Sequence, residues 1–108
     1  MANLEPFADL TLRRLRAALE EIYGARLDRV VLFGSRARGE ADAESDHDVA
    51  VFLHDMTDRA QEMNHLTDLA TNILYNDSGL VHAMPYRAGS YDERTPLMHE
   101  IRADGMDP

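Results

Sequence analysis

Two aspartates separated by one residue, Asp46 and Asp48, begin an apolar stretch that continues to Leu53. On a β-strand, side chains two residues apart lie on the same face about 7 Å apart, so both carboxylates project together while His47 points away. Carboxylates at this spacing can converge on one divalent cation or on a pair, and oxygen ligands favour Mg²⁺ or Mn²⁺ over zinc. The pair therefore predicts a divalent-metal site, with substrate phosphates completing the coordination shell.

A second group of residues, which begins twelve positions before Asp46, has the chemistry to hold an anion. Gly34 and Ser35 end the preceding apolar run. A glycine lets the backbone approach a phosphate closely, N–H groups entering a short helix suit an anion, and Ser35 adds a hydroxyl donor. Arg36 and Arg38 can neutralise phosphate charge, although one of them can instead pair with an acid of residues 40–44. We therefore expect these four residues to bind a nucleotide.

Two common phosphate and metal motifs are excluded in this segment. It lacks the Gly-Lys-Ser/Thr ending of a Walker loop. It is not a calcium loop either, because counting from Asp42 places His47 at the glycine position and Leu53 at the glutamate position. His54, His65 and His99 fit no metal-ligand spacing.

Hydrophobic periodicity places these motifs on a short series of elements. The pattern predicts a helix before Gly24, strands over 29–33 and 46–53, a helix over 57–76, a strand over 79–86, and a helix that Thr95-Pro96 opens and Gly105 closes. The expected apolar stripes are Leu10, Leu15, Ala18, Leu19 and Ile22 on the first helix, and Met63, Leu66, Leu69, Ala70, Ile73 and Leu74 on the second.

The predicted fold class is α/β (α+β), in the order α-β-β-α-β-α. We expect a small mixed β-sheet of three to four strands, with helices packed on one side of it. Residues 49–52 are continuously apolar, which suits a central strand. Pro85 favours an edge position or a strand end for the third strand.

Length and composition narrow the class of protein. A chain of 108 residues without cysteine fits one domain, residues 1–108, in a reducing cytoplasm, and its apolar runs are too short to cross a membrane. The net charge is −9: residues 40–76 carry nine acids against Arg59 alone, while residues 1–39 carry seven arginines against five acids. Such a chain is poorly suited to bind nucleic acid unaided, and its acidic middle suits a basic partner or a divalent cation.

The segment GSRARGEADAESDHDVAV, residues 34–51, resembles the signature of the DNA polymerase β-like nucleotidyltransferase superfamily: Gly-Ser, about ten residues, then Asp-x-Asp. The resemblance is specific over residues 30–53, and the short chain is similar to the minimal nucleotidyltransferases of bacteria and archaea. It implies that Gly34 and Ser35 hold a triphosphate and that Asp46 and Asp48 are the catalytic, Mg²⁺-binding pair. The implied reaction transfers a nucleoside monophosphate, such as AMP from ATP or from another nucleoside triphosphate, to a hydroxyl and releases pyrophosphate.

One feature departs from this family. Its members often carry a third carboxylate on the following strand, whereas GLVHAMPY contains no acid. His82 is the polar residue that can occupy this position, and a structural, hydrogen-bonded histidine is the alternative.

The resemblance also implies a partner. Minimal nucleotidyltransferases of this kind pair with helical HEPN-domain proteins in toxin–antitoxin modules, as the antitoxin, and can place AMP on the partner. Because 108 residues leave no second domain to cradle an acceptor, we expect such a HEPN-type protein or a homodimer mate to complete the cleft. The alternative function is that of a catalytically degenerate module that neutralises its partner by occlusion.

Overall fold

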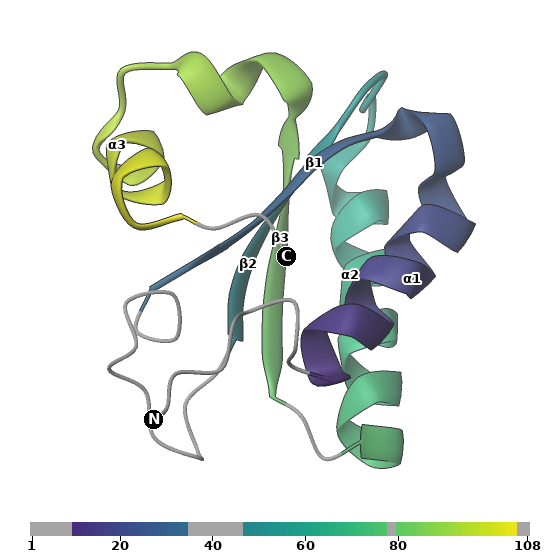
Figure 1. Ribbon diagram of the computed structural model, residues 1–108. Helices are drawn as coiled ribbons and strands as arrows, with labels where there is room; N and C mark the ends of the chain where they lie inside the picture. Colours follow the sequence, from purple (N-terminus) through teal and green to yellow (C-terminus); the bar gives the residue numbers. More distant parts are fainter. Residues whose placement is uncertain (1–9, 35–46, 78–79, 106–108) are drawn as a thin grey trace, which may run out of the picture.

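The computed structural model describes residues 10–34, 47–77 and 80–105 of the chain (Figure 1). The helices are α1 (Leu10–Tyr23), α2 (Arg59–Asp77) and α3 (Pro96–Asp104), and the strands are β1 (Leu27–Phe33), β2 (His47–Leu53) and β3 (Val81–Arg87). The short 3₁₀ turns η2 (Gly24–Arg26) and η3 (Ala88–Asp92) precede β1 and follow β3. The α/β class and the order α-β-β-α-β-α are therefore confirmed.

Within the described residues the strands form one mixed sheet in the order β1-β2-β3. β1 is antiparallel to β2, and β2 is parallel to β3. The central strand is β2, whose residues 49–52 are fully buried, as their continuous apolar run predicted. β3 forms an edge of the sheet, so the prediction from Pro85 is also confirmed.

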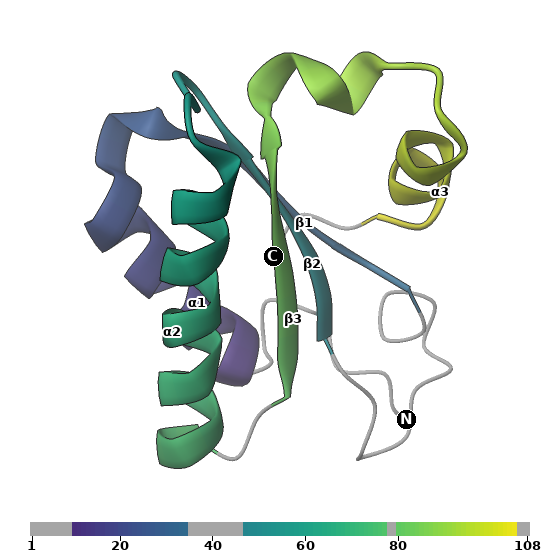
Figure 2. The same ribbon diagram turned by 180° about the vertical axis from the view of Figure 1, so that it is seen from behind.

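Helices cover both faces of the sheet, which corrects the expectation of helices on one side (Figures 1 and 2). Val49 and Val51 point into a core that α1 and α2 cover. Ala50 and Phe52 point to the opposite face, where α3 supplies the cover. A strand that is apolar at every position needs a layer on each side, so the run over 49–52 itself requires the second layer.

The buried face of α1 is slightly rotated from the predicted stripe. Its buried residues are Leu12, Leu15, Leu19 and Tyr23. Leu10 and Ile22, which the stripe included, are 54% and 51% exposed. The spacing of three and four residues selects one face, and the chain carries more apolar residues on α1 than that face can bury.

The predicted ends of the helices are confirmed by their caps. Gly24 follows α1 with a φ of +52°, a conformation that glycine adopts at little cost. Asp58 Oδ1 accepts a hydrogen bond from Gln61 N at 3.2 Å at the start of α2. Thr95 Oγ1 accepts one from Met98 N at 3.1 Å, with Pro96 as the first residue of α3.

None of the helices in residues 10–34, 47–77 and 80–105 combines the length and the apolar character that crossing a bilayer requires.

Candidate functional site

Two of the residues predicted to bind phosphate and metal, Gly34 and Asp48, lie together at one end of the sheet, where β1 ends and β2 and β3 begin. In the strand register, Asp48 lies opposite Phe33 on β1 and opposite His82 on β3. Asp48 and His82 share the sheet face on which α3 covers residues further along β2. At this end their side chains remain open, with 34% of Asp48 and 62% of His82 exposed.

Gly34 lies directly against the carboxylate of Asp48. Its φ is +82°, and a Cβ at this position would lie 2.5 Å from Asp48 Oδ2. A side chain here would therefore be strained and would also displace the carboxylate. The glycine allows the chain to turn after β1 and lets Oδ2 of Asp48 pack directly against its backbone.

His82 is the neighbour of Asp48 on the other side. Its Nδ1 lies 3.6 Å from Asp48 Oδ1. This distance is too long for a strong hydrogen bond, and it leaves Oδ2 on the Gly34 side for another ligand. The residue that the sequence offered in place of a third carboxylate therefore lies beside the aspartate.

The other predicted site residues lie outside the described residues. These are Ser35, Arg36, Arg38 and Asp46. Their roles as triphosphate and metal ligands stay predictions, and the geometry of the site is defined by Gly34, Asp48 and His82.

The Asp48 region fits a hard divalent cation. A carboxylate that is one-third exposed supplies the oxygen ligand that Mg²⁺ and Mn²⁺ prefer, and the missing Cβ of Gly34 allows it to lie against the turn after β1. Within the part of the chain that the structure describes, no group of three or more His, Asp or Glu side chains forms a complete metal site. One described carboxylate therefore needs further ligands, which the prediction assigns to Asp46 and to substrate phosphates.

His47 points away from Asp48, as the alternation along β2 requires, and is 3% exposed. Its Nδ1 contacts the carbonyl oxygen of Leu80 at 2.9 Å, and its backbone N–H donates to the same oxygen at 2.7 Å. Both contacts fix the start of β2 to the residue before β3. His47 thus has a positioning role at the site that sequence reasoning did not assign.

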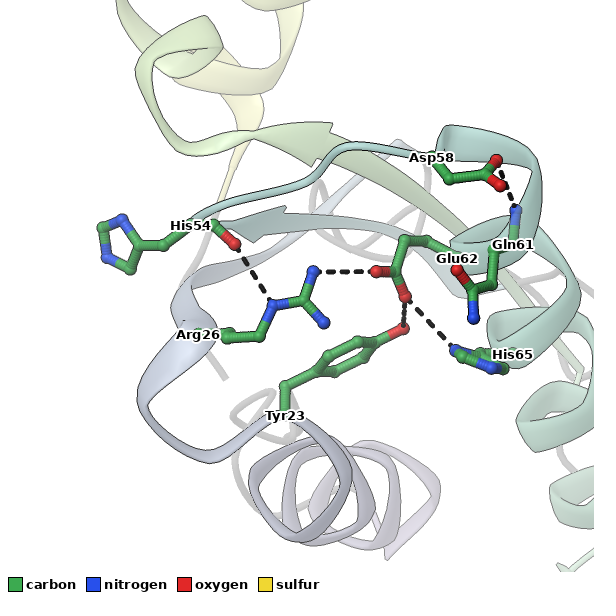
Figure 3. Close-up of polar contacts among 7 residues, drawn as sticks. All are labelled: Tyr23, Arg26, His54, Asp58, Gln61, Glu62 and His65. Carbon is green, nitrogen blue, oxygen red and sulfur yellow. Dashed lines mark hydrogen bonds and ion pairs between the residues drawn. The ribbon is translucent and has the colours of Figure 1, made fainter.

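A second polar cluster, which the sequence analysis missed, surrounds Glu62 at the opposite end of the sheet (Figure 3). The Glu62 side chain is 6% exposed and accepts hydrogen bonds from Arg26 Nη2 at 2.8 Å and from Tyr23 Oη at 3.0 Å. His65 Nδ1 lies 3.2 Å from the same carboxylate. The cluster joins the end of α1 and η2 to the first turns of α2. The available signal was a glutamate four residues after Asp58, in the first turn of a capped helix.

The hydrogen bonds to Glu62 govern its protonation. Burial acts to raise the pKa of Glu62, but the bonds from Arg26, Tyr23 and His65 outweigh it, so the pKa is lowered. Burial raises the pKa of Tyr23, and its bond to Glu62 raises it further, so the phenol stays a donor. The Glu62 cluster is therefore a satisfied structural ion pair without an open ligand position.

Comparison with known proteins identifies a family match along most of the chain. Residues 12–93 match the family described as “Nucleotidyltransferase domain”. A protein of Methanocaldococcus jannaschii, named “Putative protein adenylyltransferase MJ0141”, is 42% identical over 45 residues. That match covers 42% of this chain and 46% of the relative, so the chain matches less than half of the relative's length.

Solved structures share the fold. A crystal structure of a toxin–antitoxin with AMP-PNP aligns with a TM-score of 0.63 and 21% identity, over 88% of this chain and 69% of that chain. A mutant of the toxin–antitoxin MntA-HpeT aligns with a TM-score of 0.60 and 21% identity, over 89% and 70%. At these identities the likeness establishes the common fold alone.

Proposed function

The chain belongs to the nucleotidyltransferase domain family, and from this premise we propose that it transfers a nucleoside monophosphate, AMP from ATP, to a hydroxyl of a partner protein. The observation that carries the proposal is the contact between Gly34 and Asp48. The lack of a Cβ at Gly34, whose φ is +82°, lets the part-exposed Asp48 carboxylate pack directly against the start of the predicted phosphate-binding turn. The names of the relatives, a protein adenylyltransferase and toxin–antitoxins, support a protein acceptor.

The metal site of this proposal consists of Asp46 and Asp48, with Mg²⁺ or Mn²⁺ as the cation. The cation supplies charge neutralisation at the reacting phosphate oxygens. In this proposal the chain supplies the two carboxylates, and Gly34, Ser35, Arg36 and Arg38 hold the triphosphate.

The proposed transfer is an in-line displacement. A bond forms between the acceptor oxygen and the α-phosphorus, and the bond from this phosphorus to the bridging oxygen of the β-phosphate breaks, so pyrophosphate leaves. The acceptor hydroxyl loses its proton, and His82, beside Asp48, is the described side chain that can accept it.

The biological setting that we propose is based on the relatives. A single domain over residues 1–108 acts in the cytoplasm as the antitoxin of a helical HEPN-type toxin, which is also the AMP acceptor. The toxin–antitoxin neighbours support this assignment through their fold.

The test is a transfer assay with α-labelled ATP, Mg²⁺ and the purified product of the neighbouring gene. Label is expected on the partner with the wild-type chain and lost with Asp48→Asn. Asp92→Asn, at an exposed acid of η3, is the matched control and keeps the wild-type rate. Ser35→Ala is expected to lower transfer while the thermal midpoint and partner binding persist. Equal label with Asp48→Asn and wild type would contradict the proposal.

The second candidate function, a degenerate module that acts by occlusion, is favoured by one observation. The β3 residue opposite Asp48 is a histidine rather than an acid. The variants His82→Ala and His82→Asp separate the two functions. If the chain is an enzyme, His82→Ala lowers transfer and His82→Asp, which restores a carboxylate, retains it. If the chain only occludes, the complex forms and no divalent metal supports label transfer by any of these proteins.

A further inference from the structure

A mostly apolar groove of about 280 Å³ lies between α2 and the start of β3. Met63, Ala70 and Leu74 line it from α2, and Leu80 and His82 line it from the β3 side. His82 therefore belongs both to the groove and to the pair with Asp48. The groove lies on the α2 side of the sheet and the Asp48 pair on the α3 side, so the two meet at the edge strand β3.

The α2 wall of the groove uses apolar residues that the core does not bury. The sequence predicted one broad apolar stripe on this helix. Leu66 and Ile73 of that stripe are buried, whereas Leu74 is 44% exposed. One part of the apolar stripe thus packs in the core, and the other part lines the groove. The groove part offers apolar area to another molecule.

The β3 wall carries backbone groups that no other described residue bonds. Peptide groups of successive strand residues point to opposite edges, and the carbonyl oxygen of Leu80 points to β2, because His47 N donates to it at 2.7 Å. The carbonyl oxygen of Pro85 points to the outer edge, because it accepts from Arg59 Nε at 3.2 Å. By this alternation Val81 and Ala83 also direct their peptide groups outward, at the edge of the sheet formed by the described strands.

The two halves of this edge differ. At Pro85 the edge lacks an N–H, and the Arg59 guanidinium, which also lies 5.7 Å from the ring centre of Tyr86, covers its carbonyl. At Val81 and Ala83, beside the groove, no described residue covers the edge in this way. Figure 2 shows β3 running beside α2 along this side of the molecule.

We infer that this groove binds an extended segment of the partner protein, which pairs with β3 at Val81 and Ala83 and presents its acceptor hydroxyl to His82 and Asp48. Outward peptide groups select a polypeptide in strand conformation, and the apolar lining selects apolar side chains on alternate positions. The nine acids against one arginine in residues 40–76 favour a segment flanked by basic residues. The inference rests on the proposed transfer to a protein, for which it supplies the acceptor-binding surface.

The test uses two variants of the full chain, one for each wall. Leu74→Glu places a charge in the groove. Val81→Pro removes an outward N–H at the first residue of β3, where proline is tolerated and no bond to β2 is lost. Ile22→Glu, at an apolar residue of α1 that is 51% exposed, is the matched control.

Three quantities are measured: affinity for the purified product of the neighbouring gene, label transfer to it, and Mg²⁺-dependent binding of ATP. Both groove variants are expected to weaken the complex about tenfold or more, with a parallel loss of label and unchanged ATP binding. Ile22→Glu is expected to match the wild type. Thr71 of α2 also lines the groove. A photo-crosslinker in its place is expected to capture a partner peptide that contains the labelled hydroxyl.

The outcomes separate the inference from the function. If Leu74→Glu and Val81→Pro keep the wild-type affinity and transfer, the groove is not the binding surface for the partner segment, and the proposed transferase activity is unaffected. A complex that depends on Leu74 but carries no label with the wild-type chain would support the groove and overturn the transferase. A crosslink from Thr71 to a second copy of this chain, or no binding of the neighbouring product by the wild type, would overturn the partner segment as the occupant.

Discussion

The two ends of the sheet each hold a carboxylate, and the surroundings of the two carboxylates are opposite. Glu62 is 6% exposed and is bound by Arg26, Tyr23 and His65 (Figure 3). Asp48 is 34% exposed, and its one described polar contact is His82 at 3.6 Å. A carboxylate whose hydrogen bonds come from its own chain stabilises the fold, whereas a part-exposed carboxylate without a strong described partner is available to a ligand. This contrast predicts that activity and stability respond to different substitutions.

The largest expected effect is that of Asp48→Asn on transfer. Loss of the carboxylate charge should lower the rate about a hundredfold or more, as for removal of other groups that stabilise charge at a reacting centre. The free energy of unfolding should change by less than about 0.5 kcal/mol, because the side chain is part-exposed and weakly bonded. Steady-state transfer and urea unfolding measure the two quantities. A strongly destabilised Asp48→Asn would break the contrast.

Glu62→Gln is the reciprocal experiment. It replaces charged hydrogen bonds in a buried cluster, so the free energy of unfolding should fall by about 2 kcal/mol, which lowers the thermal midpoint of a domain of this size by roughly 10 °C. Transfer per folded molecule should stay at the wild-type rate. Glu20→Gln, in the exposed Arg16–Glu20 ion pair at 3.0 Å, is the control and should change stability by less than about 0.5 kcal/mol.

Gly34→Ala should affect both properties, more moderately. A φ of +82° costs a residue with a Cβ about 1–2 kcal/mol, and the added methyl group displaces the Asp48 carboxylate. Calorimetry and the transfer assay should therefore both report a loss. Gly89→Ala, where a Cβ would meet no atom within 4 Å, serves as the control. Full transfer activity in Gly34→Ala would contradict the role of Gly34 in positioning the Asp48 carboxylate.

The smallest effect is a dependence on pH. The pKa of Glu62 is lowered in the folded chain, so its ionised form contributes stability above its ordinary value of 4.5, and this contribution is lost as the pH falls through the folded pKa. The difference in free energy of unfolding between wild type and Glu62→Gln should therefore be constant near neutral pH and shrink below about pH 4.5. Urea unfolding across pH 3–7 measures it.

Local patterns were sufficient to predict the elements. The runs that became β1 and β2, and the caps at Asp58 and Thr95, depend on neighbours within a few residues. The proximity of Gly34 and Asp48 was also predictable. The Gly-Ser motif follows one strand, and the Asp-x-Asp motif begins the next strand along the chain. This part of the site could be approached from sequence because Gly34 and Asp48 belong to one continuous stretch, whereas His82 comes from β3.

The remaining features depend on contacts between distant residues. The Glu62 cluster joins residues 36 and 39 positions apart, and no periodicity along α2 indicates which polar side chain will be buried. The second layer over the sheet required knowing that both faces of β2 are apolar. The groove was present in the sequence as a stripe too broad for one core face, but only packing shows which part of it stays open.

The Arg59 bond to Pro85 has a consequence for the chain when it is produced in excess of its partner. A long bare strand edge recruits the edges of other molecules and leads to insoluble sheet stacks. Here a guanidinium and a proline interrupt that template in the middle of β3, so its outward peptide groups form two short pieces rather than one continuous edge. Pairing of two copies of the chain through β3 is therefore disfavoured by the same arginine that caps the Pro85 carbonyl.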